Sequence, residues 1–472
     1  MKKNFFLPLI LLAALLVSTA APAAYAAPAP ELNGKNIVLA DLNTGRIIYS
    51  KDKDAVVAPA SLTKIMTVLL AVESIDRGEH SLDEMVTAGA DCRTGLDEES
   101  SSAEIQPGEQ MTFRDLLYCS MIQSASDACN VIASLVGGSI NGFVDKMNER
   151  AAELGCEVTH FEDPNGLSNN NQTTAYEMFL ITQEAISHDY FMVVCNIADV
   201  TIPATNMHEE REYHNSNSLI SPQSVYGGNR YLYTGAAGVK TGYTRAAGYC
   251  LISTAEREGL HFLAVVMGCD GWLNAHIEDY LNFEDTIKLY DWGFSDFSYR
   301  NVVDTQTPVY ELDVELAEND AKAVLYPTER IRLLLPRDTS DEDIHLDYTI
   351  YNTELRAPVK AGEVLGEAVV SVNGEVYGTV SLVTREAVDL ARSQYMKQQL
   401  ATFFTNRWVI GITVVILLTA ALYITLRIRY RKAREQYMED RRQAEIRRRK
   451  RQKELEENAA RAGTCKKKQN VV

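Results

Sequence analysis

The most constraining feature of this sequence is an uncharged apolar run of 19 residues that extends from Trp408 to Leu426. As a helix rising about 1.5 Å per residue, the run would cover about 28 Å, close to the thickness of a bilayer's hydrocarbon core. Basic residues follow it, beginning with Arg427-Ile428-Arg429, and cytoplasmic flanks of membrane spans are typically basic. The sequence therefore predicts a transmembrane helix at 408–426 and a basic cytoplasmic tail at 427–472. A buried core helix is disfavoured because nothing after it could form a globular partner.

The first 26 residues have the pattern of a secretory signal peptide. Lys2 and Lys3 precede an apolar run from Phe5 to Val17, and Ala24-Tyr25-Ala26 offers a small-x-small cleavage site. We interpret residues 1–26 as a signal peptide removed after Ala26, since the apolar run is short for an uncleaved membrane anchor. The two segments together predict a single-pass cell-membrane protein whose residues from 27 to about 405 lie outside the cytoplasm.

The net charge of −18 is unevenly distributed. Residues 427–472 contain 17 basic residues (Lys or Arg) and 7 acidic residues (Asp or Glu). Residues 4–426 contain 27 basic and 57 acidic residues. Such an acidic body repels a phosphate backbone, so nucleic acid is not expected as a partner. The basic run from Arg447 to Arg451 is better explained as a stop-transfer and lipid-headgroup feature.

The eight cysteines do not form a metal-binding or disulfide-scaffold pattern. They lie at positions 92, 119, 129, 156, 195, 250, 269 and 465. Cys465 falls in the predicted tail, and the other seven cannot all pair within one chain. Neither Cys-x-x-Cys nor His-Glu-x-x-His spacing occurs, so we expect no metal and no other cofactor. Buried free thiols are favoured, with a single bridge such as Cys119–Cys129 left open.

Hydrophobic patterning predicts an α/β unit at residues 33–295. Segments 36–42 and 46–49 flank the turn Asn43-Thr44-Gly45, which indicates a β-hairpin. Helices are predicted at 61–76, at about 112–136, at 140–154 with Ser139 as cap, at 173–187 and at 274–291, and strands at 248–254 and 261–267. Strands at both ends of this unit predict one antiparallel sheet assembled from distant parts of the chain.

Short strand-like segments separated by acidic turns predict a small all-β domain at residues 305–386. They lie at 309–314, 323–326, 330–335, 345–351, 368–372 and 376–383, and Asn373-Gly374 is a strong hairpin turn between the last two. Residues 387–407 are expected to form a polar, helical juxtamembrane spacer.

Chemistry is indicated first by the tetrapeptide Ser61-Leu62-Thr63-Lys64 at the start of the predicted helix. Residues three apart share a helix face, so Lys64 can reach the Ser61 hydroxyl. A partly desolvated lysine can take the proton that makes serine a nucleophile, and the N–H groups of a helix start can stabilise an oxyanion. Alone, the tetrapeptide is equally compatible with an ordinary helix start.

Two further segments give the tetrapeptide its weight. Ser124-Ala125-Ser126 lies inside the predicted helix 112–136, where serines usually bond only to the preceding turn. Lys240-Thr241-Gly242-Tyr243 leads into a predicted strand; it offers a cation and a hydroxyl suited to a carboxylate, and glycine permits close approach of a substrate backbone. Read singly, this segment could be a β-turn.

In this order and spacing the three segments resemble the motifs of penicillin-binding proteins and β-lactamases. Two more stretches, Asp163-Pro164-Asn165-Gly166-Leu167 and Gly242-Tyr243-Thr244, resemble the low-molecular-weight penicillin-binding proteins that are serine-type D-alanyl-D-alanine carboxypeptidases. The resemblance covers roughly residues 30–390. It implies an α/β penicillin-recognising domain (β-lactamase/transpeptidase-like), at 33–295, followed by the small β domain.

The resemblance also implies an activity and a set of roles. Ser61 would attack the carbonyl between two D-alanines of a peptidoglycan stem peptide, with Lys64 as its base and Ser124 as proton relay to the leaving amine. Lys240 and Thr241 would bind the terminal carboxylate, Gly242 would allow close approach, and the N–H groups of Ser61 and Tyr243 would form the oxyanion hole. β-Lactam antibiotics would be inhibitors.

The sequence departs from the family pattern at two places near the site. Ser126 stands where the family usually has Asn, and its shorter side chain puts the contact with the substrate amide in doubt. His214-Asn215-Ser216-Asn217 occupies the region where the family often has an arginine. Two other functions therefore remain open: a penicillin-binding sensor with little turnover, and a β-lactamase. The latter is disfavoured because the one Glu-x-x-Leu-Asn match, Glu278 to Asn282, follows Lys240.

Overall fold

The computed structural model describes residues 28–98, 100–270 and 279–465, so the predicted signal peptide lies outside the described residues. The chain divides into two compact units. The larger takes in the chain up to residue 307 with 327–349 and 367–380, and the smaller takes in 308–326, 350–366 and the chain from 381 onward. The domain borders inferred from the sequence stay predictions.

A five-stranded antiparallel sheet forms the centre of the larger unit, in the order β2-β1-β9-β8-β7. Its strands are β1 Asn36–Asp41, β2 Ile47–Lys51, β7 Ala236–Thr244, β8 Gly248–Arg257 and β9 Leu260–Cys269. The hairpin β1–β2 thus joins strands from more than 200 residues later through β9. The predicted hairpin and the predicted assembly of the sheet are both confirmed, and β7 lies at one edge.

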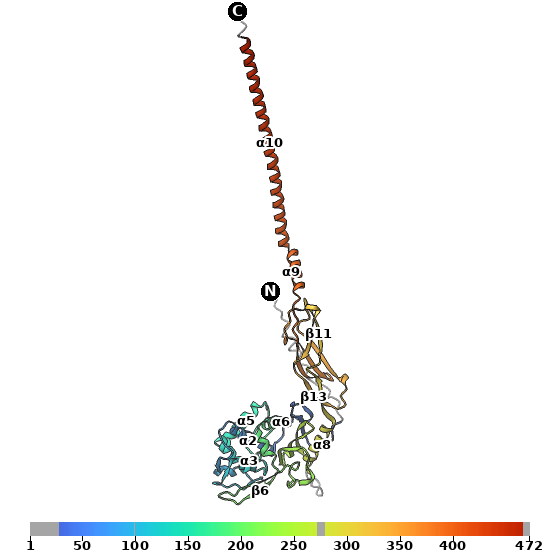
Figure 1. The fold of residues 1–472 in the computed structure, drawn as a ribbon. Helices are drawn as coiled ribbons and strands as arrows, with labels where there is room; N and C mark the ends of the chain where they lie inside the picture. Colours follow the sequence, from blue (N-terminus) through green and yellow to red (C-terminus); the bar gives the residue numbers. More distant parts are fainter. Residues whose placement is uncertain (1–27, 99, 271–278, 466–472) are drawn as a thin grey trace, which may run out of the picture. The chain divides into compact units, whose positions relative to one another are not determined.

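Two hydrophobic cores cover the sheet. One packs buried side chains of the helices between β2 and β7 against it, and the other packs α8 (Leu281–Asp296) against it. Figure 1 shows α2, α3, α5 and α6 grouped together and α8 apart from them. The first core contains the helices that carry two of the three sequence motifs.

The helical layer follows the prediction except at two points. Its helices are α2 Lys64–Asp76, preceded by the 3-10 turn η1 (Ala60–Thr63), α3 Phe113–Met121, α4 Ser126–Gly137, α5 Ile140–Glu153, α6 Ala175–Ser187 and α7 Asp189–Cys195. Ser139 caps α5 as expected, by accepting the backbone N–H of Gly142. The single helix predicted at 112–136 is wrong: α3 ends and α4 begins anew, and Ser124 lies in the break. The short α7 was not predicted.

Two small hairpins border the helical layer. β3 (Met85–Thr87) pairs with β4 (Gln110–Thr112), and β5 (Asp199–Ile202) pairs with β6 (Arg211–His214), both antiparallel. Neither was predicted, because three- and four-residue strands carry almost no periodicity.

The six strands predicted between 305 and 386 are confirmed. Five of them belong to a six-stranded sheet of order β14-β16-β17-β12-β11-β15, and β13 pairs instead with β10. The bounds are β10 Phe297–Val303, β11 Tyr310–Glu315, β12 Lys322–Pro327, β13 Ile331–Pro336, β14 Ile344–Ile350, β15 Leu355–Arg356, β16 Val364–Val372 and β17 Glu375–Thr384. Asn373 and Gly374 both have positive φ, as the turn between β16 and β17 requires.

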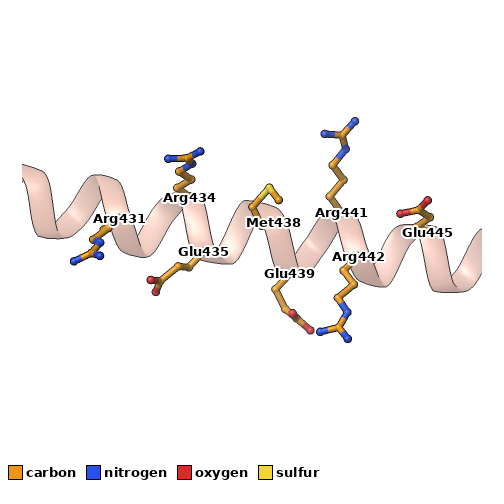
Figure 2. Close-up of a pocket in the computed structure, with 8 residues that line it drawn as sticks. All are labelled: Arg431, Arg434, Glu435, Met438, Glu439, Arg441, Arg442 and Glu445. Atoms are coloured by element: carbon orange, nitrogen blue, oxygen red, sulfur yellow. The ribbon is translucent and has the colours of Figure 1, made fainter.

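Two helices follow the β strands. α9 (Arg392–Thr405) occupies most of the predicted spacer, and α10 (Arg407–Cys465) contains a segment long and apolar enough to cross a membrane. The predicted tail continues this helix (Figure 2), where Arg431 and Glu435, and Arg441 and Glu445, are four residues apart. Such spacing of opposite charges supports a helix whose side chains are exposed in the part of the chain that the structure describes. The hollow between these side chains is lined by residues of α10 alone, so we do not regard it as a ligand-binding cavity.

Candidate active site

Ser61 and Lys64 meet at the junction of η1 and α2. The Lys64 Nζ donates hydrogen bonds to Ser61 Oγ at 2.9 Å and to the Asn165 carbonyl at 2.8 Å. Lys64 is completely buried, and this burial lowers the pKa of its ammonium. Ser61 remains partly exposed. The pair therefore joins a reachable hydroxyl to a lysine that readily becomes neutral.

A tight turn brings the Asn165 carbonyl to Lys64. The Asp163 carboxylate accepts the backbone N–H groups of Asn165, Gly166 and Ser168, a local pattern typical of Asp in turns. Gly166 has φ +87°, and a Cβ there would overlap the Ala60 carbonyl. Glycine is thus required for this turn to pack against η1. The sequence indicated the segment from Asp163 to Leu167 only through the family resemblance. It did not predict that the Asn165 carbonyl accepts a hydrogen bond from Lys64.

The second motif lies in the break between α3 and α4, not within a helix. Ser124 has φ +61° and is 7% exposed, and Ser126 begins α4 and is 1% exposed. The backbone N–H of Ser126 donates to the Ser101 carbonyl at 2.8 Å. Among the described residues, the Ser126 hydroxyl has no hydrogen-bond partner, which is costly for a buried polar group.

Two side chains that the sequence analysis missed fix α4 in place. The Asp127 carboxylate accepts the Ser102 hydroxyl and the backbone N–H groups of Ala103 and Ile105. The Asn130 amide donates to the Cys92 and Thr94 carbonyls, and its oxygen accepts the Asn165 amide at 3.1 Å. Asn130 thereby links the second motif to the turn that holds Lys64.

The third motif runs along the edge strand β7, whereas the sequence placed it before a strand. A Cβ on Gly242 would lie 3.2 Å from the Ser61 nitrogen and 3.3 Å from the Leu62 nitrogen. Glycine thus permits β7 to approach the N–H of Ser61. Lys240 is 1% exposed, and its Nζ donates to the Thr241 carbonyl at 3.0 Å. Burial, together with the nearby charge of Lys64, lowers the pKa of Lys240 to about 7.

The remaining residues of this motif lie further along β7. The Thr241 hydroxyl is 2.6 Å from the hydroxyl of Ser216. Tyr243 is 47% exposed and stacks at 4.4 Å, between ring centroids, on its cross-strand neighbour Tyr249. The structure thus brings Ser61, Lys64, Lys240 and Gly242 together, with Thr241 and Tyr243 continuing the same strand.

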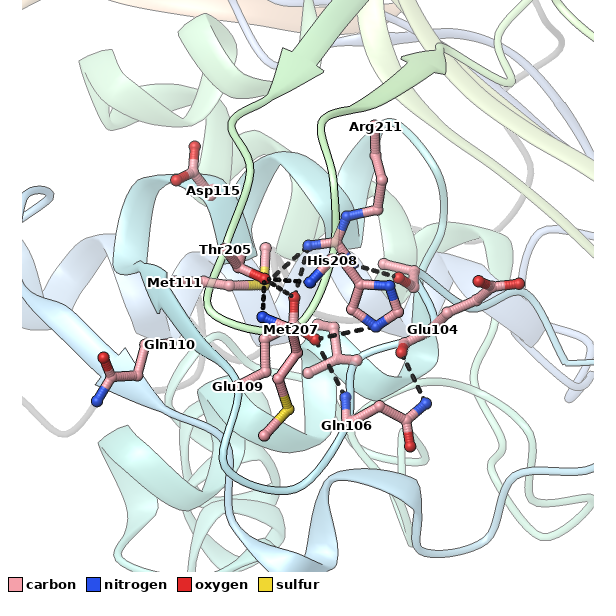
Figure 3. Close-up of polar contacts among 12 residues, drawn as sticks. Glu104, Gln106, Glu109, Gln110, Met111, Asp115, Thr205, Met207, His208 and Arg211 are labelled. Carbon is pink, nitrogen blue, oxygen red and sulfur yellow. Dashed lines mark hydrogen bonds and ion pairs between the residues drawn. The ribbon is translucent and has the colours of Figure 1, made fainter.

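A buried carboxylate, that of Glu109, anchors the β5–β6 hairpin (Figure 3). Glu109 accepts hydrogen bonds from Arg211 at 2.7 Å and from Thr205 at 2.9 Å. Arg211 also donates to the Ala103 carbonyl at 2.7 Å, and the N–H of Ala103 binds Asp127. The hairpin is therefore connected, through the loop that contains Ala103, to the start of α4.

Among the residues that the structure describes, one cluster has a geometry that could hold a cation: Glu73, Glu184 and His188. The Arg150 guanidinium already bonds Glu73 at 2.8 Å and Glu184 at 2.5 Å. Because this guanidinium supplies the positive charge, we assign the cluster to helix packing. The seven cysteines from Cys92 to Cys269 are all buried and free, so the Cys119–Cys129 bridge left open above is not formed.

Comparisons with known proteins converge on one family. Residues 23–271 match the family model described as D-alanyl-D-alanine carboxypeptidase, and residues 297–390 match that of the penicillin-binding protein 5 C-terminal domain. D-alanyl-D-alanine carboxypeptidase DacF of Bacillus subtilis (strain 168) is 29% identical over 383 residues, 80% of this chain and 92% of that protein. DacC of Escherichia coli (strain K12) is 29% identical over 395 residues, 78% of this chain and 88% of that protein.

Solved structures agree in fold. The D-alanyl-D-alanine carboxypeptidase DacD of Francisella tularensis superposes with a TM-score of 0.60 at 23% identity, over 80% of this chain and 98% of that one. Penicillin-binding protein 5 of Haemophilus influenzae superposes with a TM-score of 0.59 at 23% identity, over 79% of this chain and 100% of that one.

Proposed function

The chain belongs to the D-alanyl-D-alanine carboxypeptidase family, and we propose that it removes the terminal D-alanine from peptidoglycan stem peptides through an acyl-enzyme on Ser61. The observation that carries the assignment is the 2.9 Å contact between Ser61 Oγ and the buried amine of Lys64. A buried lysine is neutral at a lower pH than an exposed one, and a neutral amine can accept the serine proton.

In acylation, the neutral Lys64 amine takes the Ser61 proton as Oγ bonds to the carbonyl carbon of the penultimate D-alanine. The developing oxyanion accepts hydrogen bonds from the backbone N–H groups of Ser61 and Tyr243. Gly242 supports this role, since it lets β7 approach the Ser61 nitrogen. Ser124 then relays the proton to the amine of the departing D-alanine as the peptide bond breaks.

Deacylation reverses the roles with water as the nucleophile. Lys64 takes a proton from water, the hydroxide oxygen bonds to the acyl carbon, and Ser61 Oγ leaves with the proton returned to it.

Before acylation, the terminal carboxylate of the peptide is bound by the Lys240 cation and the Thr241 hydroxyl. Ser126 faces the substrate amide as a short stand-in for a longer amide side chain.

β-Lactams fit the same chemistry as inhibitors. Their strained ring amide acylates Ser61, while the attached ring fragment cannot depart as a free D-alanine does. A carboxylate on the β-lactam takes the place of the terminal carboxylate of the peptide, so Lys240 and Thr241 serve both ligands.

The proposal includes a location. A signal peptide cleaved after Ala26 exports the chain, α10 crosses the cell membrane once, the catalytic part lies outside, and the tail lies in the cytoplasm. Support comes from the helix long and apolar enough to span and from the basic residues that follow it.

The test uses the full-length protein in detergent. With a peptide ending in D-Ala-D-Ala, we expect the wild type to release D-alanine and the Ser61→Ala variant to release none. After penicillin treatment, mass spectrometry should find the adduct on the peptide containing Ser61. An adduct elsewhere, or release by Ser61→Ala at the wild-type rate, would refute the assignment.

A sensor with little turnover is the second candidate, and the buried, unbonded hydroxyl of Ser126 among the described residues is the observation that favours it. Such a protein would be acylated by penicillin on Ser61 yet release no D-alanine. A β-lactamase would instead hydrolyse penicillin repeatedly. Measuring penicillin hydrolysis beside D-alanine release therefore separates all three functions.

A further inference from the structure

The hydroxyl of Thr241 has a contact outside the three motifs, and its partner is Ser216. The two oxygens are 2.6 Å apart. We propose that Ser216 is a positioning residue for carboxylate recognition, which acts through Thr241 by directing the Thr241 hydrogen toward the ligand. This inference rests on the proposed function, because it concerns the carboxylate of the same substrate.

The backbone around Ser216 is held from three sides. Its N–H donates to the Ile122 carbonyl in the break between α3 and α4, and its carbonyl accepts the Ser224 hydroxyl at 2.9 Å. The neighbouring Asn217 amide donates to the Gly238 carbonyl of β7. Ser216 is therefore fixed relative to both the second motif and the strand that carries Thr241.

The other neighbour, Asn215, adds further contacts. The Asn215 amide donates to the Cys195 carbonyl at the end of α7 and to the Ile197 carbonyl just after it. Asn215 and Asn217 are both buried. Two amide side chains thus clamp the residue between them, which makes the position of the Ser216 hydroxyl preorganised before any ligand arrives.

Proton counting gives the direction of the contact when a ligand is bound. Each hydroxyl has one hydrogen, and an ionised carboxylate can only accept. With a carboxylate present, Thr241 donates to it, so Ser216 must be the donor to Thr241 Oγ1. A hydroxyl that accepts one hydrogen bond becomes a stronger donor in the next. Ser216 therefore both orients the Thr241 hydroxyl and strengthens its bond to the anion.

The consequence is selective. Loss of the Ser216 hydroxyl weakens recognition of a terminal carboxylate but has little effect on a neutral terminus, which never required an oriented Thr241 donor. A purely structural role would lower turnover of both kinds of substrate alike. The ratio between acid and amide substrates thus reports the proposed role and not general damage.

The experiment compares a peptide ending in D-Ala-D-Ala with the same peptide carrying a C-terminal amide, using the full-length protein in detergent. For Ser216→Ala we expect kcat/KM on the acid peptide to fall about tenfold, the upper end of the usual effect of losing one hydrogen bond between neutral groups. We expect kcat/KM on the amide peptide to change less than about twofold. The Ser216→Thr variant, which keeps a hydroxyl, should have the wild-type kcat/KM on the acid peptide. In a Thr241→Ala background, Ser216→Ala should have no further effect.

Ser218→Ala is the matched control. Ser218 lies two residues away on the same segment, is fully buried, and bonds to Ser224 and to the Tyr226 carbonyl instead of Thr241. This variant should keep the wild-type acid-to-amide ratio, with its thermal midpoint as a measure of fold damage. Equal losses on both peptides in Ser216→Ala, or no loss on either, would overturn the proposal.

Failure of the proposed function is distinguishable from failure of this inference. If the wild type releases no D-alanine, the same ratio is measured as the rate of acylation by penicillin against that by its methyl ester. In that case the inference is supported if Ser216→Ala is acylated more slowly by penicillin but not by its methyl ester. An unchanged ratio of the two acylation rates refutes it.

Discussion

At the scale of single residues, the site depends on two buried lysines that need opposite charges. Lys64 acts as a base only when it is neutral, whereas Lys240 attracts a carboxylate only when it is protonated. Burial lowers the pKa of both, and for Lys240 to about 7. A bound carboxylate favours the cation, so the proton on Lys240 matters most for the free enzyme.

This arrangement predicts the basic limb of the pH profile. Below pH 7 most Lys240 is protonated, and above it the free enzyme loses the cation that attracts the carboxylate, so kcat/KM for an acid peptide should fall as pH rises past about 7. The parameter kcat/KM reports the ionisations of the free enzyme. Lys240→Arg keeps its charge at every accessible pH and should abolish this limb.

The measurement is kcat/KM between pH 6 and pH 10 for both proteins. The C-terminally amidated peptide serves as the control substrate, because its binding does not need the cation and should lack the decline. A basic limb that persists in Lys240→Arg would assign the ionisation to another group.

At the scale of elements, the β5–β6 hairpin is anchored by one buried ion pair. The Glu109 side chain is completely buried and that of Arg211 is 13% exposed. Removing Arg211 would leave the buried Glu109 carboxylate with His208 at 3.6 Å and the Thr205 hydroxyl at 2.9 Å among its polar neighbours. Breaking a buried ion pair by removing one partner typically costs about 3–5 kcal/mol. Since Arg211 also bonds the loop that contacts Asp127, the damage should extend to the start of α4.

We therefore expect Arg211→Met to lower the thermal midpoint of the larger unit by several degrees and to reduce D-alanine release. The matched control is Arg114→Met, which breaks an ion pair with Asp83 whose side chains are 37% and 84% exposed. Exposed pairs contribute about 0–1 kcal/mol, so this variant should unfold close to the wild type. A similar midpoint for both variants would contradict the anchoring role.

The elements also show where sequence reasoning ends. Leu116 and Ile132 continue one apolar pattern across the predicted helix 112–136, because α3 and α4 bury side chains in the same core. What separates the two helices is long-range: the N–H of Ser126 bonds the Ser101 carbonyl, a contact that no local pattern contains. Periodicity therefore predicted the helices and could not predict the break in which the second motif lies.

The candidate site divides in the same way. The pairing of Ser61 with Lys64 follows from helical spacing and was predicted. The contacts of Asn165 with Lys64 and of Ser216 with Thr241 join residues 101 and 25 positions apart. Likewise, β7 contains small residues with little strand preference and is a strand because it pairs with β8. Such tertiary contacts became visible only in the folded chain.

At the scale of the whole molecule, charge and cysteine distribution divide the chain at the apolar run. Residues 4–426 hold 57 acidic residues and residues 427–472 hold 17 basic ones. Seven cysteines precede the run and are buried, and Cys465 follows it. Because burial raises the pKa of thiols such as Cys129 to about 12, these seven should resist reagents that need a thiolate.

Cys465 can therefore report on which side of the membrane the tail lies. In spheroplasts with an intact bilayer, a membrane-impermeant maleimide should leave the folded protein unlabelled, since its outer thiols are buried and Cys465 is in the cytoplasm. Permeabilising the bilayer under native conditions should add one label per chain, on the peptide that contains Cys465, and Cys465→Ser should abolish it.

Unfolding in urea provides the positive control, because it should expose the buried thiols and label the Cys465→Ser variant as well. Labelling of Cys465 in intact spheroplasts would reverse the proposed orientation, and would place the Ser61 site on the side of the membrane where no peptidoglycan is found. Labelling of the other cysteines without urea would instead contradict their burial. The two outcomes fall on different peptides, so a single digest distinguishes an inverted topology from an open core.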